Sequence, residues 1–178
     1  ARHQMPAAHY DRALALYDQG DYQRAVDPYN ASIQLNPHDA WAYNGRGMAL
    51  SELGKFDRAI ADHNEALRLD PNYADAYHGR GYALDGKGDY EEAVADYNRA
   101  IRMGVTYSEV YHNRGLAHHN LGQLDAALRD YNKAIQLDPT SGVTYHGRGS
   151  VWDEKGEHEK ALDDYEQALR FEPGSPVV

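Results

Sequence analysis

The chain repeats itself every 34 residues, and this period constrains its fold more than any other feature. Residues 40–73 and 74–107 align without a gap, and further units begin at Pro6, Ser108 and Gly142. Repetition at such a period is typical of arrays in which each unit buries its apolar face against a neighbour. The sequence therefore predicts one repeat domain over residues 1–178, with units at 6–39, 40–73, 74–107, 108–141 and 142–175.

Apolar and small residues within each unit recur at steps of three and four, as on one face of a helix. In the second unit Gly54 falls between two such runs, and Pro71 follows the second run. Glycine often ends a helix, and proline restricts the residue before it. Each unit is thus predicted to form a helix, a short turn and a second helix. The predicted fold class is all-α, with almost no strand.

Small residues keep fixed positions in both helices of the unit. Glycine inside a helix costs about 0.5–1 kcal/mol relative to alanine. Its return in four first helices therefore predicts a close contact that a methyl group would obstruct. These glycines are Gly47, Gly81, Gly115 and Gly149, and they accompany an alanine row in the second helices at Ala25, Ala59, Ala93, Ala127 and Ala161.

The period, these small residues and the prolines after the second helices resemble the tetratricopeptide repeat family, over five units of 34 residues. The prolines are Pro37, Pro71, Pro139 and Pro173. The resemblance implies a right-handed superhelical solenoid of five helix-turn-helix repeats. It also implies a concave groove, lined by the first helices, that binds a peptide or protein segment. In the third unit Met103-Gly104-Val105 replaces the aspartate-proline ending, so a different joint is expected before Ser108.

Carried over position by position, the resemblance places the groove on three rows of first-helix residues that share a face by helical spacing. The first row becomes rich in histidine toward the C-terminal units, and the third contains two aspartates. The predicted groove residues are Tyr10, Leu14, Tyr17, Asn44, Met48, His78, Tyr82, Asp85, His112, Asn113, His119, His146 and Asp153.

The charge of this surface bears on its partner. No lysine occurs in the three rows, whereas Asp75, Asp85, Glu109 and Asp153 are acidic and would repel an acidic tail. Some members of the family bind C-terminal carboxylates through lysine, arginine and asparagine, and only Asn44 and Asn113 resemble part of that set. A neutral or basic protein segment is the expected partner, and the expected role is that of an assembly scaffold or adaptor.

Three histidines of the first row come from successive units, which should lie on the order of 10 Å apart. Zinc needs ligands at about 2.0–2.1 Å from one ion, so no metal site is expected. Groove histidines near carboxylates would titrate around pH 6–7, which predicts a pH-dependent ligand affinity. His118 replaces a leucine or tryptophan of other units and is expected to be a half-buried packing residue.

An arginine recurs once in every first helix, where the family often has an apolar residue. An arginine on a buried face normally takes a carboxylate partner, so structural ion pairs are predicted. In the first unit Pro28 replaces the aspartate, which is expected to bend that helix and to leave Arg12 without its partner. The predicted pairs join Arg46, Arg80, Arg114 and Arg148 to Asp62, Asp96, Asp130 and Asp164.

Composition removes several functional classes. A net charge of −10 argues against nucleic acid as the ligand, and no apolar run approaches the length of a membrane span. There is no cysteine, no phosphate-binding loop and no serine in a nucleophile turn, so no enzymatic activity and no cofactor are expected. The compartment stays open: cytoplasmic is the default for a soluble chain, and a processed secreted or periplasmic form remains an alternative.

A second role is suggested by the last unit. Leu162, Tyr165 and Leu169 occupy the positions that a following unit would cover, and few residues remain after them to form a capping helix. An uncovered apolar strip favours association. The alternative function is therefore a structural scaffold that forms a homo-oligomer through its C-terminal repeat. The other explanation of the strip is that the parent chain continued beyond this repeat.

Overall fold

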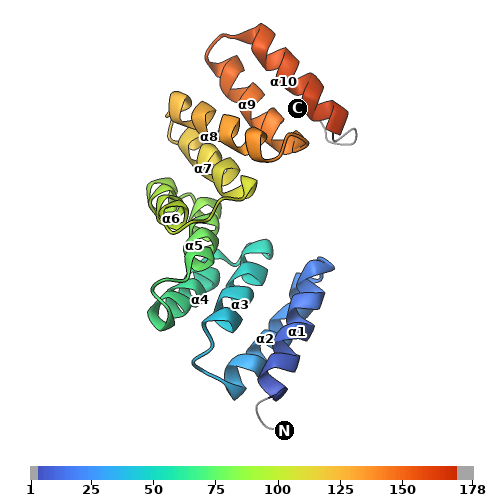
Figure 1. Cartoon of the computed structure of the whole chain (residues 1–178), viewed down its shortest axis with the longest axis vertical. Helices are drawn as coiled ribbons and strands as arrows, with labels where there is room; N and C mark the ends of the chain where they lie inside the picture. The colour runs from blue at the N-terminus through green and yellow to red at the C-terminus, as the bar shows by residue number, and fades with distance from the viewer. Residues whose placement is uncertain (1–3, 172–178) are drawn as a thin grey trace. The chain divides into compact units, whose positions relative to one another are not determined.

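The computed structural model describes residues 4–171, with side chains placed from residue 7 onward. Within that range the chain forms ten α-helices and no strand, so the predicted all-α helical repeat fold is confirmed (Figure 1). No helix in this range is long and apolar enough to cross a membrane. Pro173 and the end of the last predicted unit lie outside it. The helices are α1 (Gln4–Asp18), α2 (Tyr22–Leu35), α3 (Ala40–Glu52), α4 (Phe56–Leu69), α5 (Ala74–Lys87), α6 (Tyr90–Arg102), α7 (Ser108–Asn120), α8 (Leu124–Leu137), α9 (Gly142–Glu154) and α10 (His158–Phe171).

The chain divides into two compact units, which are described separately. Unit 1 ends at Gly104 and contains α1 to α6; unit 2 begins at Val105 and contains α7 to α10. Within each unit, consecutive helices form antiparallel pairs, and the first helices also contact one another: α1 with α3, α3 with α5, and α7 with α9. Each unit is therefore a stack of helical hairpins.

Local chemistry explains where these helices end. Gly54 adopts a φ of +69° between α3 and α4, a conformation that side-chain-bearing residues rarely adopt. After α4, the Asp70 carboxylate accepts a hydrogen bond from the Asn72 amide at 2.9 Å, and Pro71 cannot continue the helix. α6 ends at Arg102, and Gly104 follows with a φ of +100°. The sequence departure in the third unit thus coincides with the division between the two units.

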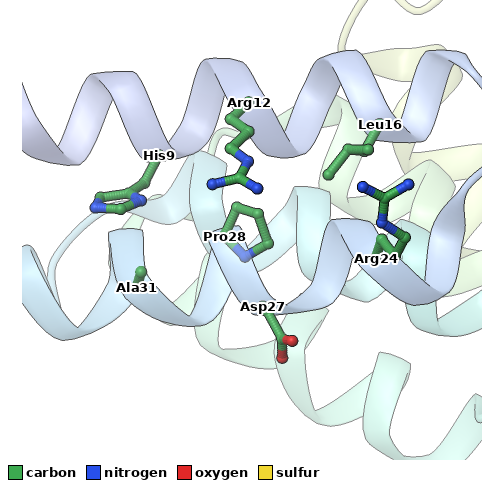
Figure 2. Close-up of a pocket in the computed structure, with 7 residues that line it drawn as sticks. All are labelled: His9, Arg12, Leu16, Arg24, Asp27, Pro28 and Ala31. Carbon is green, nitrogen blue, oxygen red and sulfur yellow. The ribbon is translucent and has the colours of Figure 1, made fainter.

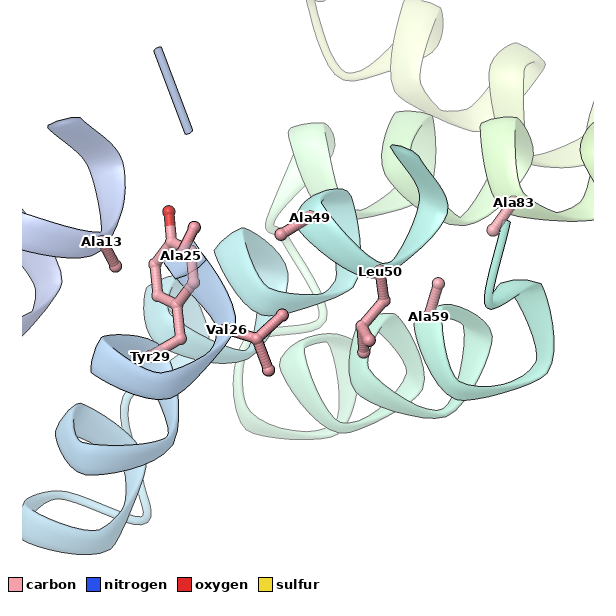
Figure 3. Close-up of a cluster of buried hydrophobic side chains, with 8 residues drawn as sticks. All are labelled: Ala13, Ala25, Val26, Tyr29, Ala49, Leu50, Ala59 and Ala83. Atoms are coloured by element: carbon pink, nitrogen blue, oxygen red, sulfur yellow. The ribbon is translucent and has the colours of Figure 1, made fainter. Parts of the chain in front are cut away.

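The core is built from small residues of both helices and one large ring from each second helix. Ala13, Ala25, Val26 and Tyr29 lie at the centre of the unit 1 core, together with residues of the next hairpins (Figure 3). In the hairpins that follow, the position of Tyr29 is taken by His63, Tyr97, Tyr131 and Tyr165; all but Tyr165 are completely or almost completely buried.

The glycines of the first helices are needed because these rings press against them. A Cβ added at Gly47 would lie 2.8 Å from His63, and one at Gly81 would lie 2.8 Å from Tyr97, closer than real Cβ atoms approach. The predicted close contact is confirmed, and its partner is the ring. A second glycine row, which was not predicted, faces the ring of the preceding hairpin: at Gly79 the Cβ would lie 2.4 Å from His63.

The arginine row forms the predicted ion pairs. The Arg46 guanidinium donates to both carboxylate oxygens of Asp62, at 2.7 and 2.6 Å, and the pairs at Arg80, Arg114 and Arg148 repeat this geometry. A third partner was not predicted: Arg46 also donates to Asn30 of the preceding hairpin at 2.7 Å. Arg80 reaches Asn64 and Arg148 reaches Asn132 in the same way. We call this arrangement the Asn–Arg–Asp bridge, since within each unit it ties a hairpin to the one before it.

The first hairpin lacks this bridge. α2 continues through Pro28 as one helix, so the proline does not interrupt it. The predicted loss at Arg12 is confirmed: Arg12 is exposed, and no hydrogen bond or ion pair joins it to another residue of the described range.

Candidate functional site

The first predicted groove row is partly interior in unit 1. The Tyr10 ring packs against Tyr29 with centroids 5.8 Å apart, and the His78 ring packs against Tyr97 at the same separation. Asn44 is buried, and its side chain lies within hydrogen-bonding distance of His63 Nδ1, at 3.0 Å. These residues support the hairpin interior, so little of this row is available to a ligand.

The corresponding residues of unit 2 are also engaged. His112 packs against Tyr131 and lies 3.1 Å from the Thr144 hydroxyl. Burial lowers the pKa of His112, which favours its neutral form. Among the other predicted residues of unit 2, Asn113 is half-buried, His146 is exposed beside Tyr165, His119 lies 2.9 Å from Glu154, and Asp153 pairs with His158 at 2.7 Å.

His118 is half-buried, as predicted, and it also has polar neighbours. Its Nδ1 lies 2.6 Å from the Gln123 side-chain oxygen, and its Nε2 lies 3.8 Å from Asp130. Within the described range, no group of three or more histidine, aspartate or glutamate side chains is arranged to hold a metal ion. His118 therefore takes part in local packing and hydrogen bonding.

The remaining groove rows of unit 1 are more accessible. Leu14 is 39% exposed, and Met48, Tyr17, Tyr82 and Asp85 are half-buried. Three of these residues lie near the C-terminal ends of α1 and α5, in the first helices of the first and third hairpins. They place aromatic and acidic side chains on one face of unit 1.

Asp85 has the most unusual environment of this face. Its Oδ1 atom is inaccessible to solvent and has no hydrogen-bond partner in the described range. Burial raises the pKa of the Asp85 carboxyl from 3.8 to about 6. A half-buried carboxylate without a cationic partner is poorly stabilised, because desolvation penalises its charged form.

Asp85 lies near Tyr82, which also has a further tyrosine and a second carboxylate close to it. The rings of Tyr17 and Tyr22 meet edge to face with centroids 5.1 Å apart. Burial raises the pKa of the Tyr17 and Tyr82 hydroxyls, and the negative charge of Glu52 raises both further. Asp85 itself contributes to the raised pKa of Tyr82. We call Tyr17, Glu52, Tyr82 and Asp85 the acidic tyrosine cluster.

Two further buried polar atoms belong to the same part of unit 1. The hydroxyls of Ser51 and Tyr97 are inaccessible and have no hydrogen-bond partner in the described range. Burial, followed by the negative charge of Asp85, raises the pKa of Tyr97. Buried polar atoms without a protein partner are uncommon in folded proteins.

The chemistry of this cluster favours a cation. Two carboxylates supply negative charge, and tyrosine rings attract ammonium and guanidinium groups. Perturbed carboxyl groups of this kind occur more often at functional sites than elsewhere. Sequence reasoning found Tyr17, Tyr82 and Asp85 but missed Glu52 and Tyr22. Glu52 directly follows the third groove row, and Tyr22 opens a second helix, so a search confined to first-helix rows could not include them.

Sequence models of known families match along most of the chain. Models described as tetratricopeptide repeats match residues 40–73 and 108–141, 64–95, and 143–175. Another, described as a TPR repeat, matches residues 13–54 and 86–122. No curated protein matches the chain in a sequence comparison.

Solved structures resemble the chain in fold. MamA from Desulfovibrio magneticus RS-1 is 20% identical, with a TM-score of 0.81 and coverage of 98% of this chain and 99% of that one. TTC0263 from Thermus thermophilus is 22% identical, with a TM-score of 0.79 and coverage of 96% and 93%. YrrB, a TPR protein with an unusual peptide-binding site, is 23% identical, with a TM-score of 0.71 and coverage of 93% and 86%.

Proposed function

Because the chain belongs to the tetratricopeptide repeat family, a family of protein-interaction scaffolds, we propose that it binds a protein segment on the first-helix face of unit 1. The segment places a lysine or arginine in the acidic tyrosine cluster. The observation that carries this proposal is Asp85, a half-buried carboxylate whose Oδ1 atom has no partner in the described range. The role is one of binding, with no catalytic step.

The energetics of the site support a cationic side chain. An ammonium or guanidinium group at the accessible part of the half-buried Asp85 side chain would compensate its charge, and a charge-assisted bond is about twice as strong as a neutral one. The rings of Tyr17 and Tyr82 would add cation–π attraction. The acidic chain as a whole, with a net charge of −10, would attract a basic segment and repel an acidic one. YrrB, which has a similar fold, is described by its peptide-binding site.

Matched peptide libraries test this proposal. We expect decapeptides with a fixed central lysine, and random residues elsewhere, to bind more tightly at pH 7.5 than the same library with central glutamine or glutamate. Asp85→Asn should weaken lysine-library binding by about tenfold or more and leave the glutamine library unchanged. Fluorescence anisotropy with labelled libraries measures both.

The control is Asp153→Asn, which removes the same charge at the corresponding position of unit 2, where His158 already pairs with the carboxylate. It should leave binding unchanged. Asp85→Asn should also fold normally, because burial already disfavours the charged carboxylate that it removes. Equal binding of the lysine and glutamate libraries, or equal loss in the two variants, would contradict the proposal.

A second candidate function is supported by the last hairpin. Leu162 and Leu169 are 59% and 44% exposed, whereas Leu128, at the position of Leu162 in the preceding hairpin, is 7% exposed. Tyr165 is half-buried, with its hydroxyl 3.5 Å from Ser150. This apolar strip on α10 fits self-association of the chain into a scaffold.

A further inference from the structure

A pocket beside Arg12 lacks one wall that the corresponding pocket further along unit 1 has. The pocket between α1 and α2 has a volume of about 300 Å³ and is lined by His9, Arg12, Leu16, Arg24, Asp27, Pro28 and Ala31 (Figure 2). In the picture the Arg12 guanidinium points toward the Pro28 ring, and Asp27 points away from it. Arg24 already pairs with Asp21, so Arg12 is the cation of this pocket that has no partner in the described range.

The corresponding pocket lies two periods further along the chain. It has a volume of about 290 Å³ and includes Arg80, Leu84, Glu92, Ala95 and Asp96, which correspond to Arg12, Leu16, Arg24, Asp27 and Pro28. It also has a wall that the Arg12 pocket lacks: Ile60 and Asn64 of the preceding helix α4. Asn64 completes the Asn–Arg–Asp bridge with Arg80, at 2.7 Å.

The same period identifies which residues could supply the missing wall. Ile60 and Asn64 correspond to Leu162 and Glu166 of α10. Leu162 is 59% exposed; Glu166 is exposed and has no hydrogen bond or ion pair with another residue of the described range. Every earlier second helix has asparagine at this position, whereas α10 has a glutamate. Arg12 is the arginine whose aspartate partner is replaced by Pro28. It is thus complementary in charge to Glu166, which has a carboxylate where the earlier second helices have asparagine.

We propose that two copies of the chain associate head to tail, with α10 of one copy closing the Arg12 pocket of the next. Leu162 packs on Leu16, as Ile60 does beside Leu84, and the Glu166 carboxylate accepts hydrogen bonds from the Arg12 guanidinium. Glu166 thereby supplies the negative charge that Pro28 removed. This inference rests on the second proposed function and names both surfaces that meet.

One residue limits the strength of this joint. A first helix can approach the ring of the preceding hairpin because it has a glycine there, at Gly45, Gly79 or Gly147. The corresponding residue of α1 is Asp11. A Cβ at Gly147 would lie 2.8 Å from the Tyr131 ring, so the Asp11 side chain would meet Tyr165 of the other copy. We therefore expect a reversible association weaker than the packing between hairpins inside a unit.

A charge swap tests the proposal by sedimentation velocity, from about 5 to 200 µM. The unchanged chain should associate with increasing concentration. Arg12→Glu and Glu166→Arg should each be monomeric, because like charges then face each other. Their equimolar mixture should associate again, since each joint regains one arginine and one glutamate. Asp163→Arg, the same charge change at an exposed residue of α10 outside this joint, should behave like the unchanged chain. All substituted residues are exposed, and circular dichroism should show an unaltered fold.

The Asp11 position gives a test by gain of affinity. Asp11→Gly should tighten the association by roughly tenfold, whereas Asp11→Ala, which removes the same charge but keeps a Cβ, should tighten it less. If the unchanged chain associates and both charge variants associate equally well, self-association stands and this interface is wrong. A mixture that stays monomeric also overturns the interface. A strictly monomeric unchanged chain overturns both it and the second candidate function.

Discussion

Replacing Asp62 by alanine is expected to lower the free energy of unfolding of unit 1 by about 3 kcal/mol, because it leaves a partly buried guanidinium without its carboxylate. The Asp62 side chain is 9% exposed and that of Arg46 is 20% exposed. Arg46 would keep its hydrogen bond to Asn30 and its contact with the Tyr43 ring, neither of which supplies a negative charge. The loss would therefore exceed that of a surface ion pair.

The same helix supplies the control. Asp57 of α4 pairs with Lys87 at 3.0 Å and is 84% exposed, so Asp57→Ala should cost less than about 1 kcal/mol. Trp41 lies in unit 1 and Trp152 in unit 2, so in a Trp152→Phe background urea unfolding followed by tryptophan fluorescence reports unit 1. Equal costs for the two substitutions would show that the bridge does not stabilise the array as described.

Acidification is expected to destabilise unit 1 through His63. Burial, followed by the positive charges of His78 and Arg80, lowers the pKa of His63 to about 3. Its Nε2 atom has no hydrogen-bond partner in the described range, and its ring lies between Gly47 and Gly79. The unfolded chain binds a proton at this residue near pH 6.5, whereas the folded chain does not. Stability is therefore lost as the pH falls from 6.5 toward 3, by about 2 kcal/mol between pH 7.5 and 5.0.

His63→Tyr provides the comparison, because the corresponding hairpins bury a tyrosine between the same two kinds of glycine, as Tyr131 shows with Gly115 and Gly147. Urea unfolding of the Trp152→Phe chain at pH 7.5 and 5.0 should show the loss, and the His63→Tyr variant should show much less of it. The raised pKa of Asp85 has the opposite effect, because it makes the folded state more stable as the pH falls. Asp85 is present in both chains, so its effect is common to the two measurements. An equal pH dependence in the two would refute the assignment to His63.

The repeat period predicted much of the fold, because both its signals and its contacts are local. Gly54 and Pro71 marked helix ends that the structure contains, and the glycine row predicted close helix contacts. The Arg46–Asp62 pair was predictable for a similar reason: both residues belong to one hairpin, whose two helices must face each other.

Contacts between hairpins were less predictable. The bond from Arg46 to Asn30 depends on how one hairpin stacks on the next, which the pattern within one unit does not determine. For the same reason the row of His78 was predicted to face a ligand, although its ring packs on Tyr97 inside the hairpin. The unpartnered state of Asp85 depends on every neighbour of the acidic tyrosine cluster, so only a three-dimensional structure could show it.

The most direct test of cation binding by this cluster is the pKa of Asp85 itself, followed by the carbon-13 resonance of its carboxyl group during a pH titration. In the free chain the pKa should lie at about 6. A bound cation favours the ionised carboxylate, so saturation with the lysine library should lower the pKa by roughly one unit or more. We predict this decrease with the lysine library and none with the glutamine library. A pKa of Asp85 that stays the same when the lysine library is bound would contradict cation binding by the cluster.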